Sequence, residues 1–123
     1  MAHPLLSASW LDDCNRALAT LRADPELPAT LAVTELIADA PEGRLDAVTL
    51  VADVEGVRLV AGGDDRATAW LTLAFADAEA LHEGRLDPAT ALGEGRVRVR
   101  GDLHAVVVAA GLLAAAHAVL RGR

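Results

Sequence analysis

The sequence predicts an α+β fold, with a five-stranded, mainly antiparallel mixed sheet covered by helices. Apolar residues recur at helical spacing near both ends of the chain. Between these ends, four strand-like segments follow one another, and a fifth comes only after two short helical segments. Strands that come in a run, rather than alternating with helices, favour an antiparallel sheet covered by helices. A chain of 123 residues is expected to form a single domain, residues 1–123.

The first helix is expected to begin near Ser7 or Ser9, whose side chains can accept a hydrogen bond from the first turn. Asp12 and Asp13 are expected in that first turn, where the helix dipole favours acidic groups. Apolar residues recur at helical spacing at Leu11, Cys14, Leu18 and Leu21. The prolines at 25 and 28 are expected to end the helix, because proline cannot continue it.

The strand-like segments are rich in β-branched and aliphatic residues and are separated by turn residues. They lie at 30–39, 47–54, 57–62 and 68–75. Glu55 and Gly56 form a two-residue link between the second and third of them, which predicts a tight hairpin. A fifth strand is expected at 96–100, where "RVRVR" alternates strictly. Its place after the helices allows it to enter the sheet parallel to a neighbour.

The remaining helices are marked by acidic caps and glycine stops. Asp77 is expected to cap a short helix that ends at Gly84. Asp87 and Pro88 are typical of a helix start, because proline suits the first helical position. Gly93 and Gly95 then release the chain into the last strand, Gly101 turns it, and Asp102 caps a long apolar C-terminal helix.

Residues 75–113, "FADAEALHEGRLDPATALGEGRVRVRGDLHAVVVAAGLL", resemble the C-terminal half of the sterol carrier protein 2 family. The resemblance rests on residues whose spacing fits that family without gaps: Asp77, Gly84, Leu86, Asp87, Pro88, Gly95, the strand Arg96-Val97-Arg98-Val99, Gly101 and Asp102. The N-terminal half is similar in element order only. The chain looks like a stand-alone, bacterial-type single domain of this family.

The resemblance implies a five-stranded sheet with helices packed over one face. It also implies an apolar tunnel between sheet and helices that accepts sterols, fatty acids or fatty acyl-CoA. Where the family usually carries bulky apolar residues before the second glycine, this chain has Ala91 and Leu92, which leaves the tunnel's size and ligand open. The sequence ends in "RGR", so a peroxisomal address of the Ser-Lys-Leu type, which some relatives carry, is not expected.

Most of the residues expected to contact a ligand lie at strand positions that alternation turns inward or on one face of the last helix. They are Leu31, Val33, Leu50, Leu59, Leu71, Leu73, Phe75, Leu92, Val97, Val99, Val106, Val107, Ala110 and Leu113. The same alternation places Val48 and Val54 on the inward face. Two roles are open for Arg96, Arg98 and Arg100. They either bind a carboxylate or a CoA phosphate, or they form a solvated strand face. Trp10 and Trp70 either line a binding mouth or anchor the core.

Other function classes have little support in the sequence. The formal net charge of −7 argues against a nucleic-acid or anionic-membrane partner. The single cysteine, Cys14, is expected to be a buried structural thiol. The four histidines do not have the spacing of a metal site. We therefore expect no catalytic residues, no metal, no cofactor and no enzymatic activity. The N-terminus lacks the features of a secretory signal, so a cytoplasmic protein is expected.

The C-terminal helix is apolar on more sides than packing on a sheet requires. Its surplus apolar surface can contact a ligand, a second copy of the chain in a homodimer, or the first helix. His104, Gly111 and His117 within it argue against stable membrane insertion. The sequence thus predicts a carrier of a lipid or other long apolar small molecule. Two alternatives stay open: a non-catalytic structural or dimerisation module with a filled or vestigial tunnel, and a small enzyme that acts on an acyl substrate.

Overall fold

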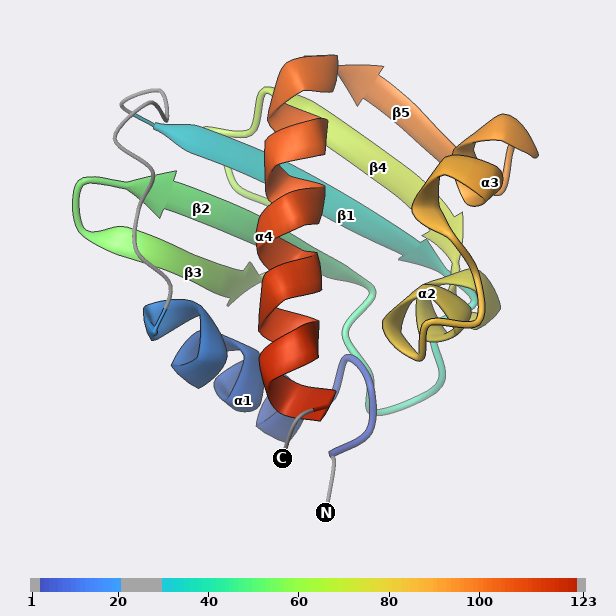
Figure 1. Cartoon of the computed structure of the whole chain (residues 1–123), viewed down its shortest axis with the longest axis horizontal. Helices are drawn as coiled ribbons and strands as arrows, with labels where there is room; N and C mark the ends of the chain where they lie inside the picture. Colours follow the sequence, from blue (N-terminus) through green and yellow to red (C-terminus); the bar gives the residue numbers. More distant parts are fainter. Residues whose placement is uncertain (1–2, 21–29, 122–123) are drawn as a thin grey trace.

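The computed structural model describes residues 3–20 and 30–121 of the chain. Within them, a single mixed sheet has the strand order β3-β2-β1-β4-β5, with β1 at its centre (Figure 1). Its strands are β1 (Leu31–Ala38), β2 (Ala47–Asp53), β3 (Gly56–Ala61), β4 (Ala69–Ala74) and β5 (Val97–Gly101). Neighbouring strands are antiparallel except β1 and β4, which are parallel. The predicted α+β fold with a mainly antiparallel mixed sheet is confirmed.

The helices of the described residues gather over one face of this sheet (Figure 1). They are α1 (Ala8–Ala19), α2 (Phe75–His82), α3 (Pro88–Gly93) and α4 (Leu103–Arg121). The long helix α4 crosses the sheet and packs against α1, β1, β4 and β5. Helix α1 packs on the other side of α4, against β3. The short helices α2 and α3 lie beyond the opposite side of α4.

Side chains cap three of the helices as the sequence predicts. The Ser7 hydroxyl accepts a hydrogen bond from the backbone N–H of Trp10, at 3.1 Å. The Asp87 carboxylate accepts from the N–H of Thr90 at 3.1 Å. Asp102 accepts from the second and third N–H groups of α4, at 3.0 and 3.3 Å. These bonds satisfy N–H groups that have no partner inside their own helices.

Several details of the prediction are wrong. Asp77 does not cap α2, which begins earlier, at Phe75, behind an uncapped Ala74. Asp12 and Asp13 lie beyond the first turn of α1, because the helix already begins at Ala8. The predicted end of this helix, and Leu21 in its stripe, lie outside the described residues.

The last strand also differs from expectation. β5 is antiparallel to its neighbour β4, and it is β4 that runs parallel to β1. The reason is the connection 62–68, which carries the chain from edge strand β3 across β2 and β1 before β4 begins (Figure 1). A crossover of this kind returns the chain in the same direction, whereas α2 and α3 then reverse it.

Strand register sets which side chains face the helices. Leu50 pairs with both Val33 and Leu59, and the three are buried on the inner face. Leu71 and Val99 pair in the same way on β4 and β5. Val54, by contrast, is 95 % exposed, because β2 ends before it and it lies in the hairpin turn.

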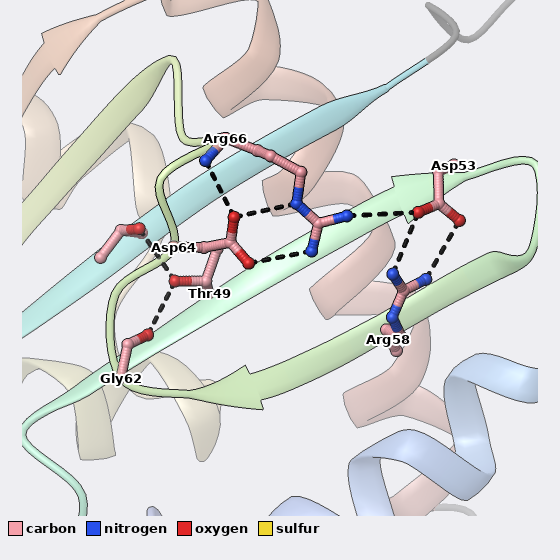
Figure 2. A network of polar contacts seen from close by, with 7 residues as sticks. Thr49, Asp53, Arg58, Gly62, Asp64 and Arg66 are labelled. Carbon is pink, nitrogen blue, oxygen red and sulfur yellow. Dashed lines mark hydrogen bonds and ion pairs between the residues drawn. The ribbon is translucent and has the colours of Figure 1, made fainter.

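The crossover connection covers part of the outer face of the sheet, over β1 and β2. The hydroxyl of Thr49 donates to the carbonyl of Gly62 at 2.8 Å and lies 2.9 Å from the hydroxyl of Thr34; both threonines are buried. Arg66 on the crossover donates two hydrogen bonds of 2.9 Å to Asp64 and lies 3.6 Å from Asp53 (Figure 2). These contacts fasten the crossover to the sheet beneath it.

Gly101 cannot accept a side chain. Its φ is +92°, and a Cβ atom there would lie 2.3 Å from the carbonyl oxygen of Thr68. We expect Gly101→Ala to lower the free energy of unfolding by about 2–4 kcal/mol, from backbone strain and overlap together. Gly111→Ala in α4, where a Cβ meets nothing within 4 Å, should instead raise it by about 0.5–1 kcal/mol. Urea unfolding of both variants measures the difference; equal stabilities would contradict the proposed overlap.

The buried threonine pair makes a second prediction. Thr49→Val keeps the side chain's shape but leaves the Gly62 carbonyl and the Thr34 hydroxyl without this partner. We expect a loss of about 1–3 kcal/mol in the free energy of unfolding. Thr72→Val, on the exposed outer face of β4, is the matched control and should change it by less than about 0.5 kcal/mol. A Thr49 variant as stable as the control would show that the crossover is held by other contacts.

Candidate ligand-binding cavity

A cavity of about 590 Å³ lies between the inner face of the sheet and the helices. Every strand contributes to its floor, with Glu35, Ile37, Val48, Leu59, Leu71, Leu73, Val97 and Val99. Its helical walls include Trp10, Ala78, Leu81, His82, Ala89, Leu92, Leu103, Val106, Val107, Ala110, Leu113, Ala114 and His117. The N-terminal Leu5 and Leu6 and the connection 84–88 complete the lining. The surface of the cavity is therefore mainly aliphatic, with Trp10, Glu35, His82, Asp87 and His117 as its aromatic and polar members.

Most of the residues expected to contact a ligand line this cavity. They are Leu59, Leu71, Leu73, Leu92, Val97, Val99, Val106, Val107, Ala110 and Leu113. Val33 and Leu50 line instead a void of about 20 Å³ beneath α4. Leu31 is buried in the packed core, and Phe75 begins α2 with the guanidinium of Arg44 5.7 Å from its ring centre. These last four expected residues do not line the main cavity, because α4 or other side chains cover them.

A cluster of three rings lies in the cavity wall, and it joins Trp10, expected either at a binding mouth or in the core, to two histidines that were not expected there. The ring centres of His82 and His117 are 4.4 Å apart, in an edge-to-face arrangement. Trp10 lies 6.2 Å from the first and 6.3 Å from the second. The three side chains come from α2, α4 and α1, so only the tertiary fold brings them together. Among the described residues, no group of three or more His, Cys, Asp or Glu could hold a metal ion.

Glu35 is the polar side chain in the floor of the cavity that sequence reasoning missed. It lies on β1, between Val48 of β2 and Leu71 of β4, and all three face the helices. Burial among these apolar neighbours raises the pKa of its carboxyl to about 7. The alternation Val33, Glu35, Ile37 was the available signal, because it places position 35 on the inner face.

The remaining candidate residues lie away from the cavity. Arg98 and Arg100 pair with Thr72 and Trp70 on the outer face, where Arg100 lies 5.1 Å from the Trp70 ring centre. Cys14 is completely buried in the core, and burial raises the pKa of its thiol to about 12. At neutral pH this thiol is protonated and is therefore a poor nucleophile.

Helix α4 forms one long wall of the cavity. Leu103–Leu120 is long and apolar enough to cross a membrane by length and composition, and 22 % of it is buried in the protein. One side of the helix packs on α1 and the sheet, an arrangement that helices of water-soluble proteins also show. Leu103 and Val107 are exposed by 56 % and 63 %, and both line the cavity.

The size of the cavity has an energetic consequence. An empty apolar void costs about 24 cal/mol per Å³. Kept dry, 590 Å³ would then cost roughly 14 kcal/mol, as much as the whole stability of a typical domain, about 5–15 kcal/mol. The cavity is therefore filled by solvent or by a ligand.

Solved structures of sterol carrier proteins share this fold. The chain superimposes on a crystal structure of sterol carrier protein 2 with a TM-score of 0.63 and 20% identity, covering 93% of this chain and 98% of that one. A palmitated sterol carrier protein 2-like 2 from Aedes aegypti matches with a TM-score of 0.56 and 21% identity, over 80% of this chain and 84% of that chain.

Part of a larger enzyme has the fold as well. A sec-alkylsulfatase matches with a TM-score of 0.65 and 18% identity over 87% of this chain, but this chain spans only 16% of that protein. At such identities the likeness concerns the fold alone. A search of curated proteins finds no significant match.

A family model covers most of the sequence. The model of the SCP-2 sterol transfer family matches residues 14–114, from within α1 to the second half of α4. The match includes the whole sheet and both short helices, so it agrees with the resemblance of residues 75–113 and extends it over the N-terminal half. The chain belongs to the SCP-2 sterol transfer family.

Proposed function

We propose that this chain is a lipid carrier that holds a long apolar molecule in the cavity between its sheet and α4. The observation that carries the proposal is the aliphatic cavity of about 590 Å³, within the ~300–1,000 Å³ that small-molecule sites occupy. Membership of a sterol transfer family supports it. The ligand classes that this family suggests are sterols, fatty acids and fatty acyl-CoA, and the palmitated neighbour supports the second of these.

The mechanism is reversible burial without covalent chemistry. Apolar ligand surface that leaves water contributes about 25 cal/mol per Å², less the loss of translational freedom on binding. Leu92, Leu103 and Val107 are exposed and also line the cavity, so they offer an apolar path from the surface into it.

The exposed apolar side chains of α4 also favour a second candidate function, a dimerisation module. Leu103 and Val107 would then be covered by a second copy of the chain. Light scattering across protein concentrations distinguishes the two: a carrier remains monomeric after delipidation, whereas a dimerisation module remains dimeric whether or not lipid is present.

The carrier proposal predicts a co-purified guest. Because an unfilled cavity of this size is unfavourable, protein purified without detergent should carry a long-chain lipid in part of the population. Native mass spectrometry should show a bound mass that organic extraction removes and identifies. Protein that binds no lipid, either as purified or after exposure to a lipid extract, would leave the structural-module alternative as the better account.

A cavity-filling substitution makes the second prediction. Ala110 lies on α4, is exposed, and lines the cavity. Ala110→Trp should fill part of the space and weaken binding of the uncharged dye Nile red by at least about tenfold.

The matched control is Ala118→Trp, on an exposed part of the same helix that does not line the cavity. It adds the same side chain and should bind Nile red as the native protein does. Fluorescence titration measures both affinities. Equal affinities for the two variants would place the dye elsewhere on the surface and contradict the proposed site.

A further inference from the structure

The lining of the cavity has carboxyl and imidazole groups but no strongly basic side chain among the described residues. Its titratable side chains within the described residues are Glu35, Asp87, His82 and His117, and none of its described lining residues is an arginine. The chain contains no lysine at all. A carboxylate or phosphate head group inside the cavity would therefore meet no guanidinium or ammonium partner from the described lining.

The arginines on and beside β5 are directed away from the cavity. Arg98 and Arg100 lie on the outer face of β5, through their pairing with Thr72 and Trp70. Arg96 is engaged with Asp77 at 3.4 Å and with Glu94 at 3.5 Å. The arginines that could have bound an acidic lipid thus either lie on the outer face of the sheet or pair with acidic side chains.

Glu35 is surrounded by apolar groups from every element packed against it. Val48 and Leu71 flank it on β2 and β4, and Ala109, Ala110 and Leu113 of α4 lie across the void beside it. The other titratable groups of the cavity come from more distant elements: His82 from α2, His117 from the C-terminal half of α4, and Asp87 from the cap of α3. A carboxyl in such surroundings resists ionisation, which agrees with its pKa of about 7.

We propose that Glu35 determines ligand specificity, so that the cavity takes long-chain lipids with an uncharged, hydrogen-bonding head group and excludes long-chain carboxylates. The inference rests on the proposed carrier function and narrows its ligand class, against the fatty acids that the palmitated neighbour suggests. A protonated carboxyl both donates and accepts a hydrogen bond, as a ligand hydroxyl does, so the two can pair without placing a charge in the cavity. A ligand carboxylate would bring its negative charge to a site where Asp87, and Glu35 when it is ionised, repel it.

This arrangement couples binding to protonation. A ligand that displaces water from around Glu35 disfavours the ionised carboxyl further, so binding favours the protonated form. Below pH 7 the carboxyl is already protonated, and binding has no such penalty. As pH rises through about 7 the carboxyl of the free protein ionises, and affinity for an uncharged lipid should fall.

The test compares 1-dodecanol with dodecanoate, which share a chain length and differ in head group. Each ligand displaces Nile red from the delipidated protein at pH 5.5 and pH 8.5. We expect dodecanol to bind at least about tenfold more tightly than dodecanoate at pH 8.5, and to bind more weakly at pH 8.5 than at pH 5.5. Glu35→Gln, which keeps a donor and an acceptor without charge, should remove dodecanol's pH dependence and improve dodecanoate binding by at least about fivefold at pH 8.5.

Glu55→Gln is the matched control, because it makes the same change in net charge at the exposed β2–β3 turn. It should behave as the native protein does in every titration. A second readout needs no ligand: Glu35→Gln should raise the melting temperature at pH 8.5 more than at pH 4.5, since it removes an unfavourable buried charge.

Each remaining outcome overturns a distinct part of the argument. Dodecanoate that binds the native protein as tightly as dodecanol at pH 8.5 overturns the proposed selectivity and leaves the carrier function intact. A pH dependence of dodecanol binding that survives in Glu35→Gln removes Glu35 as its source and assigns it to His82 and His117. If neither ligand nor Nile red binds, the carrier function itself fails, and the inference with it.

Discussion

The packing of one long helix across a wide sheet is the constraint on which the rest of the structure depends. Four inter-strand spacings of about 4.8 Å make the sheet roughly 19 Å wide, whereas a helix covers only about 10 Å. Helix α1 covers the β3 side and α4 crosses the middle, which leaves the remainder to two short helices (Figure 1). Because the inner face is built from Val and Leu with few aromatics, its side chains do not extend far enough to fill the remaining space. The cavity follows from this mismatch in area.

The outer face of the sheet, away from the helices, has to accommodate the crossover connection. Parallel pairing of β1 with β4 requires the chain to cross the sheet, and the crossover must satisfy its own polar groups against a buried surface. Thr34 and Thr49 provide hydroxyls there, and Arg66 with Asp64 holds the loop. The Arg66 guanidinium holds the pKa of Asp64 down at about 2, so this contact is kept well into acidic solution. Both the cavity and the smaller void that the described residues form lie on the helical side, so the space for a guest is found there.

Much of this architecture could be predicted from residue pattern, and the limits of that prediction have physical causes. Alternation identified inner-face residues such as Leu71 and Val99, and Asp-Pro and Gly-Asp pairs located two helix starts. Alternation does not distinguish a residue that packs, such as Leu50, from one that lines open space, because that depends on where α4 lies. The contact of His82 with His117 joins two helices and has no signal in either segment. Glu35 had the right periodicity for the inner face, but an acidic residue is ordinarily assigned to solvent.

Glu35 also makes stability and binding depend on the same proton. Its carboxyl has a pKa of about 7 in the folded chain against an ordinary value of 4.5, so the folded state holds more protons than the unfolded state between these values. Stability contributed by this group is therefore complete below about pH 4.5, declines as pH rises, and is lost above about pH 7, a change of roughly 3 kcal/mol. A leucine at this position would avoid that loss, yet it would leave the floor of the cavity without a hydrogen-bonding group. Under the proposed function, Glu35 lowers the stability of the chain at neutral pH. It also provides a hydrogen-bonding group in the floor of the cavity, which is otherwise aliphatic. A guest that pairs with the protonated carboxyl recovers part of that stability, so the loaded protein is expected to be the more stable form near pH 7.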